Sequence, residues 1–246
     1  MPLYDVASGA QTSVDGVVTA SLDFWWNRDG IIGQGPVVAA CKTTDSKIAL
    51  FTWAYGGKGG LHRGASRNGP PGSSVKMSML TADDAVVAFE NADGKLQVNC
   101  YQELDARPRL DQPLRLRVQK FVSTHSVSTF IDIAAISHLG TFTVAFADGD
   151  NNIRVLNMLR TGSDPIKVMS TAAKPPLFSP PPGNVGVKGL ALAAHSQSTC
   201  TTATMQSNQF LRVHEFGFGA GLDGTGGQAQ QVSAMDLPAL GVVKSL

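Results

Sequence analysis

The chain has 246 residues, of which 43% are hydrophobic and 16% charged, and its formal net charge at pH 7 is +1. This balance speaks against nucleic acid or an anionic membrane as a partner, because both are bound through a concentrated basic face. No run of 18 apolar residues occurs, which argues against a membrane-spanning helix, and one all-β domain can use this whole length.

Short apolar segments that carry one charged residue recur along the chain and set its period. The first is Leu22–Trp26, with Asp23 as its charge. Four later copies follow it, and their charges, Lys76, Asp132, Lys188 and Lys244, lie 56 residues apart. The first interval, from Asp23 to the second copy, is 53 residues. A repeat of this length is typical of propellers and solenoids.

Most copies are followed by two apolar runs that a turn of Asp, Asn, Ser or Gly joins. Such turns between alternating runs favour β-hairpins, because Gly and Asn tolerate positive φ. The expected hairpins are 37–53, 86–101, 142–156 and 200–214. A further run closes most repeats, at 61–66, 114–118, 166–170 and 228–234. The segments 67–74 and 175–186 are rich in Gly, Pro and Ser, and we expect them to be ordered loops between repeats.

Four short antiparallel strands per repeat are the plan of a β-propeller blade, and no stretch shows the 3.6-residue period of an amphipathic helix. We therefore predict an all-β chain in which residues 1–246 form a single β-propeller domain. Five blades are favoured and four are the alternative. Closure of five blades requires residues 2–18 and the last strand, 242–246, to meet in one blade, unless another chain completes the ring.

The hairpin pattern Val-Val-Ala-Phe-x-x-x-Asp-Gly-Lys-Leu-x-Val at 86–98 resembles the repeat of propeller proteins, including the fungal and bacterial fucose-lectin-type propellers. The resemblance covers about 20 residues of each repeat and implies a propeller fold. Lectins of that type repeat an Arg, a Glu and a Trp in each blade to hold a sugar, and no such trio recurs here. The resemblance therefore transfers no binding residue to this chain.

Charged side chains on the recurring segment face the central channel if this segment is the innermost strand of each blade. They would then form a ring of mixed sign, made of Asp23, Lys76, Asp132, Lys188 and Lys244. Buried charges require partners, so the ring is either a polar socket for a small ligand or an ion-pair network that plugs the channel. The sequence leaves both interpretations open.

A histidine and a tryptophan are further candidates near this ring. His125 is expected in a loop before the third copy, where it could exchange protons with an aspartate or be a solvated turn residue. Trp25 and Trp26 point to opposite faces of a strand, so one of them could stack on a sugar or planar ligand, or both could be core residues. His195 is expected near the opposite end of the strands, and His214 without a special role.

No sequence pattern indicates a metal ion or a cofactor. Cys41, Cys100 and Cys200 are scattered, and we expect them to be small buried residues in strands. The segment Asp148–Asn151 is expected to be a hairpin turn first and a calcium site only second. The first residues lack the basic and apolar regions of a signal peptide, which predicts a cytoplasmic protein, or a secreted one if a leader was removed.

Divergence among the repeats shapes the functional prediction. The repeats share apolar residues and differ at nearly all polar positions, which favours one unique ligand site over several identical ones. We predict a small-molecule-binding propeller with a single axial pocket, either a binder or a cofactor-independent enzyme of cyclase, isomerase or lyase type. A carbohydrate-binding lectin and a protein-interaction scaffold are the alternatives, and the oligomeric state stays open. The catalytic candidates are Lys76, Asp132 and His125, and the ligand-binding candidates are Asp23, Lys188, Trp25 and Lys244.

Overall fold

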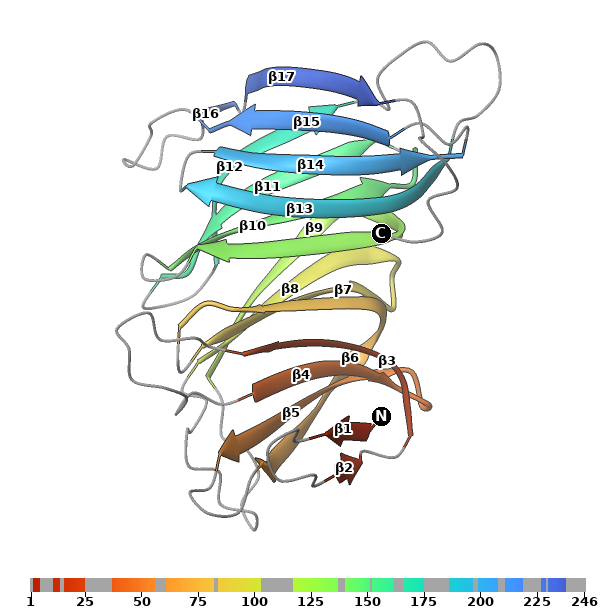
Figure 1. Ribbon diagram of the computed structural model, residues 1–246, viewed down its shortest axis with the longest axis vertical. Helices are drawn as coiled ribbons and strands as arrows, with labels where there is room; N and C mark the ends of the chain where they lie inside the picture. Colours follow the sequence, from red (N-terminus) through yellow and green to blue (C-terminus); the bar gives the residue numbers. More distant parts are fainter. Residues whose placement is uncertain are drawn as a thin grey trace. The chain divides into compact units, whose positions relative to one another are not determined.

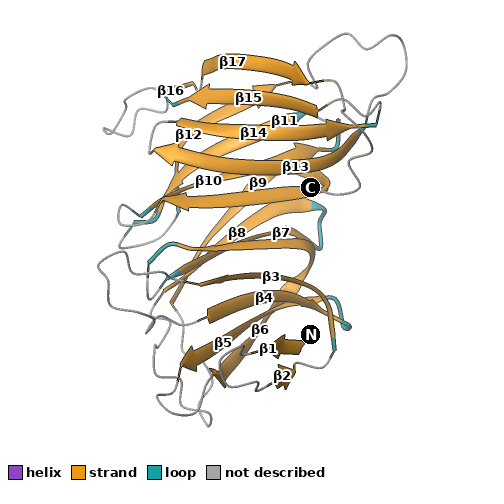
Figure 2. Ribbon diagram, in the orientation of Figure 1, coloured by secondary structure: helices purple, strands orange, loops and turns teal. Residues whose placement is uncertain are grey.

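The computed structural model shows an all-β protein (Figures 1 and 2). It describes residues 2–4, 11–13, 16–24, 37–55, 61–81, 84–102, 117–136, 140–150, 152–161, 166–174, 186–196, 199–207, 211–218, 227–228 and 230–237. Every regular element within these ranges is a β-strand, and no helix occurs among them. The prediction of an all-β chain is therefore confirmed. It was based on the alternation of apolar and polar residues and on the Gly-rich and Asn-rich turns.

The chain divides into two compact units. The first unit contains Met1–Asp93 and Gln97–Val122, and the second contains Gly94–Leu96 and Ser123–Leu246. Eleven of the described strands follow one another in one hydrogen-bonded order, and four others form a separate sheet. The long strands β6 (Leu61–Met79) and β9 (Arg117–Ile136) divide the order of eleven into three segments, which we call sheets 1 to 3, and the separate sheet of four is sheet 4.

Sheets 1 and 2 make up most of the first unit and share one long strand. Sheet 1 consists of β3 (Val17–Phe24), β4 (Val37–Thr43), β5 (Lys47–Tyr55) and the first half of β6 (Leu61–Met79). Sheet 2 consists of the second half of β6, then β7 (Ala85–Asn91), β8 (Lys95–Gln102) and the start of β9 (Arg117–Ile136). Two short strands, β1 (Pro2–Tyr4) and β2 (Gln11–Ser13), pair with each other.

Sheets 3 and 4 belong to the second unit. Sheet 3 consists of the rest of β9, then β10 (Thr141–Asp148), β11 (Ile153–Leu159) and β12 (Lys167–Lys174), whose edge pairs in parallel with β16 (Gly227–Gln228). Sheet 4 consists of β13 (Val187–Ser196), β14 (Thr199–Gln206), β15 (Leu211–Gly217) and β17 (Gln230–Leu237). The four predicted hairpins are thus confirmed as β4–β5, β7–β8, β10–β11 and β14–β15.

The predicted loop at 67–74 is wrong, because β6 continues through it. Residues of β6 up to Pro71 pair with β5, and those from Gly72 pair with β7. A register shift follows Ser73, and Ser74 has a positive φ of 52°. The chain therefore passes from sheet 1 to sheet 2 through a bend within one strand. The other predicted loop, 175–186, lies outside the described residues except for Gly186.

Closure of a ring and the number of blades stay predictions. The last predicted strand, 242–246, lies outside the described residues. Of the N-terminal residues proposed for the closing blade, the described strands β1 and β2 pair with each other. Among the described residues, eleven strands follow one another in one hydrogen-bonded order from β16 to β3, and β13, β14, β15 and β17 form a separate sheet of four.

Apolar side chains between successive sheets form the core of each unit. Alternate residues of a strand point to opposite faces, so each sheet can bury both. In the first unit, Val38, Ile48 and Leu50 of sheet 1 pack with Met77 and Phe89 of sheet 2, among others. In the second unit, Ala145, Ile153 and Val155 of sheet 3 pack with Leu190 and Phe216 of sheet 4. Burial of each large side chain contributes about 1.5–3 kcal/mol.

Candidate functional site

The predicted ring residues that the structure describes all lie on the first strand of a sheet. Asp23 is half-buried on β3, and Lys76 is exposed on β6. Asp132 is half-buried on β9, and Lys188 is exposed on β13. The remaining ligand-binding candidates, Trp25 and Lys244, lie outside the described residues.

The Asp23 carboxylate joins the first strands of sheets 1 and 2. Its Oδ2 accepts a hydrogen bond of 2.8 Å from the backbone N–H of Met79 and one of 3.2 Å from the Ser78 hydroxyl. Beside it, Ser21 Oγ accepts a 3.0 Å bond from the N–H of Met77. These side chains satisfy backbone donors on the edge of β6 that does not pair with β7, and such edge donors need partners.

Asp132 makes the same kind of bond in the second unit. Its Oδ2 accepts a 2.8 Å hydrogen bond from the backbone N–H of Leu192, on the first strand of sheet 4. Both aspartates therefore act as acceptors that hold the next first strand in place. Sequence reasoning placed them on the right strands but did not anticipate this backbone contact.

Strand register shows that the four charges do not occupy equivalent positions. Each hairpin has an alanine on the second strand of its sheet, and the cross-strand partners of Ala40, Ala88, Ala145 and Ala203 are Ser21, Lys76, Asp132 and Ala191. Asp23 lies opposite Val38 instead, two positions farther from the hairpin turn. Lys188 lies at a register shift beside Gln206 and Met205, two to three positions nearer the turn. The 56-residue spacing thus identifies the strand but not the level of each charge.

Within each unit, however, the relation between the two charges is preserved. In the first unit the lysine lies two register positions nearer the hairpin turn than the aspartate, and in the second it lies two to three positions nearer. In both units the backbone N–H that donates to the aspartate lies one register position farther from the hairpin turn than the aspartate does. We call Asp23 with Lys76, and Asp132 with Lys188, the two Asp–Lys pairs. Each stands on neighbouring first strands of one unit.

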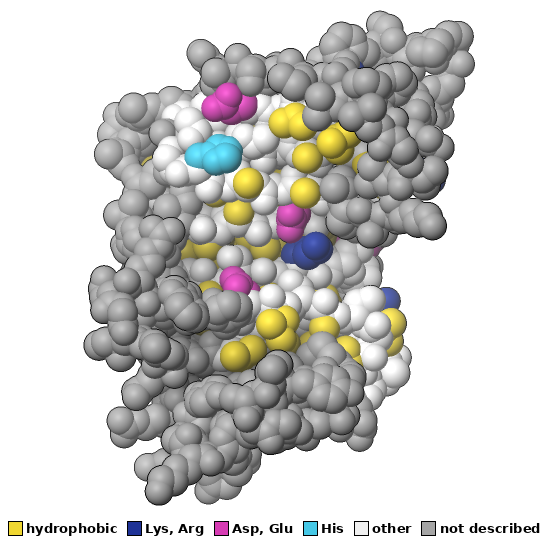
Figure 3. All heavy atoms as spheres, in the orientation of Figure 1, with side chains coloured by type: hydrophobic (Ala, Val, Ile, Leu, Met, Phe, Trp, Pro, Cys, Tyr) yellow, Lys and Arg dark blue, Asp and Glu magenta, His cyan; other side chains and the backbone are white. Residues whose placement is uncertain are grey.

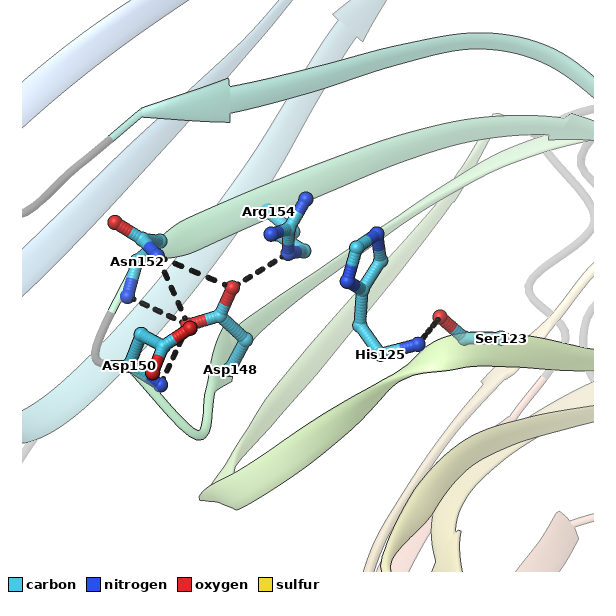
Figure 4. A network of polar contacts seen from close by, with 6 residues as sticks. All are labelled: Ser123, His125, Asp148, Asp150, Asn152 and Arg154. Carbon is cyan, nitrogen blue, oxygen red and sulfur yellow. Dashed lines mark hydrogen bonds and ion pairs between the residues drawn. The ribbon is translucent and has the colours of Figure 1, made fainter.

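His125 lies within β9 rather than in a loop, which corrects the sequence-based placement. The strand continues from Arg117 to Ile136, and the imidazole is exposed. The backbone N–H of His125 donates a 3.0 Å hydrogen bond to Ser123 Oγ (Figure 4). A role of His125 in proton transfer stays a prediction, because no hydrogen bond or ion pair between its imidazole and a carboxylate is seen among the described residues.

The turn at Asp148 is a structural hairpin turn, as expected first. Asp148 is buried, and its Oδ1 accepts bonds from the N–H groups of Asp150 at 3.0 Å and Asn152 at 2.9 Å. Its Oδ2 pairs with Arg154 Nε at 2.6 Å (Figure 4). Burial alone raises the pKa of this carboxyl, but the bonds from Asn152, Arg154 and Asp150 outweigh it and hold the pKa below the ordinary 3.8. The carboxylate is therefore engaged by the chain itself.

The three cysteines are confirmed as buried strand residues. All of them are free thiols, and burial raises the pKa of Cys41 to about 11 and that of Cys100 and Cys200 to about 12. Thiols of such high pKa are poor nucleophiles at neutral pH. Among the described residues, no group of three or more His, Cys, Asp or Glu side chains is placed to hold a metal ion.

His214 was expected in an outer strand without a special role, and the structure adds that its side chain is buried. His214 is 4% exposed, lies on β15 and stacks on Phe216 with ring centroids 6.0 Å apart. Its cross-strand neighbour Thr202 is also buried. The alternation of threonines in 199–204, where other repeats have Val and Phe, was the available signal. By contrast His195 is exposed, with Nε2 2.7 Å from Thr201 Oγ1.

On the face drawn in Figure 3, the described acidic side chains, basic side chains and one histidine lie in small groups among hydrophobic and other side chains. This agrees with the net charge of +1 and with the absence of a basic sequence cluster. The described part of the chain contains no helix that could cross a bilayer.

No protein-family model and no curated protein matches the chain. Among solved structures, it is similar to AofleA from Arthrobotrys oligospora and to a variant of that protein with three arginines replaced by alanine. Both comparisons have 12% sequence identity and a TM-score of 0.47, over 92% of this chain and 63% of the other. The chain thus spans less than two thirds of these proteins. Neither the fold described above nor the function proposed below rests on this likeness.

Proposed function

We propose that this protein is a carbohydrate-binding protein without catalytic activity, in which each Asp–Lys pair helps to bind one sugar. The observation that carries this proposal is the recurrence of the pair on neighbouring first strands in both units. A pair that occurs twice in the same relation fits a protein with two similar sites. This favours the lectin alternative over the single axial pocket that repeat divergence suggested.

The chemistry of the pair suits a hydroxyl-rich neutral ligand. Sugar hydroxyls both donate and accept hydrogen bonds, so they match a site that offers an ammonium donor and a carboxylate acceptor on neighbouring strands. Lys76 and Lys188 are exposed, on β6 and β13. A strongly anionic ligand would instead favour a cluster of cations, and the described residues on the face drawn in Figure 3 form no such cluster.

The aspartates fit binding better than proton transfer. One oxygen of Asp23 accepts the Met79 N–H, and one oxygen of Asp132 accepts the Leu192 N–H. These bonds orient each carboxylate relative to the next strand. An oriented acceptor loses little freedom when a ligand hydroxyl binds, which favours affinity. The catalytic roles proposed for Lys76, Asp132 and His125 receive no such support.

A glycan array with the purified chain tests the proposal. Three proteins are compared, namely the wild type, the double variant Lys76→Ala with Lys188→Ala, and the control Lys47→Ala. Lys47 is exposed, lies in the β4–β5 hairpin and pairs with Asp45 at 2.8 Å, away from both Asp–Lys pairs. Because neither target lysine is buried, the double variant is expected to fold.

We expect the wild type and the control to bind the same glycans, and the double variant to lose at least about tenfold in signal, as for lost bonds from a charged donor. A wild type that binds no glycan on the array overturns the carbohydrate assignment. Equal binding by all three proteins keeps carbohydrate binding but removes the Asp–Lys pairs from the site.

A further inference from the structure

In the first unit, two side chains of β3 bind two backbone donors of β6 side by side. Asp23 accepts a hydrogen bond of 2.8 Å from the N–H of Met79, and Ser21 accepts one of 3.0 Å from the N–H of Met77. The two acceptors are two residues apart, and so are the two donors, so both bonds lie along the same edge of β6. Each of these two donors therefore has an acceptor from the neighbouring first strand.

The second unit keeps the aspartate bond and lacks the serine bond. Asp132 accepts a hydrogen bond of 2.8 Å from the N–H of Leu192. Two residues before Asp132, where the first unit has serine, the chain has Phe130, whose side chain carries no oxygen or nitrogen acceptor. The corresponding donor, two residues before Leu192, is the N–H of Leu190. One substitution on β9 thus exchanges an acceptor for an aromatic ring.

Strand pairing directs the Leu190 N–H away from β14. In an antiparallel pair, alternate residues point their N–H groups at the partner strand and the residues between them point theirs away. The N–H of Leu192 leaves β14 to reach Asp132, so the N–H of Leu190 also points away from β14. Leu190 is 9% exposed, and no acceptor for its N–H is seen among the described residues. A ligand oxygen that accepts this N–H would satisfy a donor that backbone pairing leaves open.

Phe130 also places an aromatic ring beside the Asp–Lys pair of the second unit. Phe130 and Asp132 are alternate residues of β9, so their side chains leave the strand on the same face. The ring packs against the apolar cluster that contains Leu190 and is only half-buried, so part of it is exposed. Lys188 is exposed on β13, two residues before Leu190. An aromatic surface, an open backbone donor and the Asp–Lys pair therefore stand on two neighbouring first strands.

We propose that the Asp132–Lys188 pair binds a neutral pyranose whose C–H face lies on the Phe130 ring, while a hydroxyl or ring oxygen of the sugar accepts the Leu190 N–H. This inference rests on the carbohydrate-binding function proposed above and gives the two sites different ligand requirements. Pyranoses expose C–H groups on the faces of the ring and hydroxyls around its rim, which suits an aromatic side chain next to polar groups. The first unit has serine at the place of the ring.

Titration of the full chain with the methyl glycosides of glucose, galactose and mannose tests the inference. All proteins carry Lys76→Ala, which removes the first Asp–Lys pair and leaves the second. Phe130→Leu keeps an apolar side chain but removes the aromatic face, and it should weaken binding of the preferred glycoside about tenfold. Phe130→Tyr keeps the ring and should retain the affinity to within about twofold.

Phe218→Leu is the matched control. Phe218 belongs to the same apolar cluster and is 4% exposed, so its replacement alters the core without removing a surface that a ligand touches. It should leave the affinity unchanged. Saturation-transfer NMR on the protein with Phe130 intact is the second route if Phe130→Leu does not fold. Irradiation of aromatic protons should then saturate the C–H protons on one face of the sugar more strongly than those on the other.

Equal affinities with Phe130 and with leucine in its place overturn the inference, and so does saturation spread evenly over both faces of the sugar. A chain that binds glycans on the array but none of the three glycosides overturns it as well. Each of these results leaves carbohydrate binding in place. A wild type that binds neither the glycosides nor any glycan overturns the carbohydrate assignment itself, so the two failures are distinguishable.

Discussion

Asp23 shows how one polar side chain can organise a junction between two sheets. The first strand of a sheet leaves alternate N–H groups without a strand partner on its outer edge. The carboxylate of Asp23 accepts two donors from β6 at once, from Met79 and Ser78. A residue expected to serve a ligand therefore also has a structural role, and its removal should affect folding.

We predict that Asp23→Ala destabilises the protein by about 1–3 kcal/mol, because the Met79 N–H loses its acceptor. Asp23→Asn, which keeps an amide oxygen, should cost less. Asp93→Ala alters an exposed turn residue and should stay within about 0.5 kcal/mol of the wild type. Urea unfolding followed by circular dichroism measures all three. Equal stability of Asp23→Ala and Asp93→Ala would show that the Asp23 contact contributes nothing.

Asp148 should make stability dependent on acid. Its hydrogen bonds hold the pKa of the folded carboxyl below the ordinary 3.8. The stabilisation is thus complete above the pH at which the unfolded aspartate titrates, and it is lost as pH falls through the folded pKa. We predict that wild type is more stable than Asp148→Asn at pH 6, and that this difference shrinks below about pH 4. A difference that stays constant from pH 6 to pH 2 in urea unfolding would contradict the assignment.

At the residue scale, the sequence could predict which strands carry the charges but not their levels. The 56-residue interval identified Lys76 and Asp132, which share one register position relative to their hairpins. It missed the register shift at Lys188, because a bulge changes register without leaving a mark in hydrophobic periodicity. It also missed that Ser21, and not Asp23, lies at the level of these two charges.

At the scale of elements, β6 is the instructive strand. Its glycines and prolines predicted a loop, yet the strand runs unbroken from Leu61 to Met79. Glycine at 72 is required by close approach instead, because a β-carbon there would lie 2.6 Å from the Glu90 carbonyl oxygen and 2.7 Å from Phe89 Cδ2. The sequence does not distinguish a glycine that a loop requires from one that is required because a neighbouring strand approaches closely.

We predict that Gly72→Ala destabilises the protein by about 1–3 kcal/mol, since the new methyl group forces Glu90 or Phe89 to move. Gly186→Ala is the matched control, because a β-carbon at that position meets no atom within 4 Å. It should be neutral. Chemical unfolding of the two variants is the measurement, and a Gly72→Ala protein as stable as Gly186→Ala would mean that β6 does not approach β7 as closely as described.

Hairpins were the elements that the sequence predicted best. Two alternating runs joined by a turn such as Asn91–Gly94 define a hairpin within about 16 residues, without any long-range information. Contacts such as Met77 N–H to Ser21 Oγ join residues 56 apart and follow only from the folded arrangement. For this reason local structure was predictable, whereas the junctions between sheets were not.

On the scale of the whole molecule, two units of two sheets repeat one relation between an aspartate and a lysine. The two pairs lie at different register positions relative to their hairpin turns, so an alignment of the individual repeats does not show the relation. It appears only when charges are compared within a unit, between neighbouring first strands. Our account of function depends on this recurrence, since two similar pairs imply two ligand sites in one chain.

Isothermal titration calorimetry with the strongest glycan from the array tests this claim most directly. We predict two binding sites per chain for the wild type, and one for either Lys76→Ala or Lys188→Ala alone. One site per chain in the wild type, abolished by either substitution, would contradict the two-site account and restore the single site shared by both lysines.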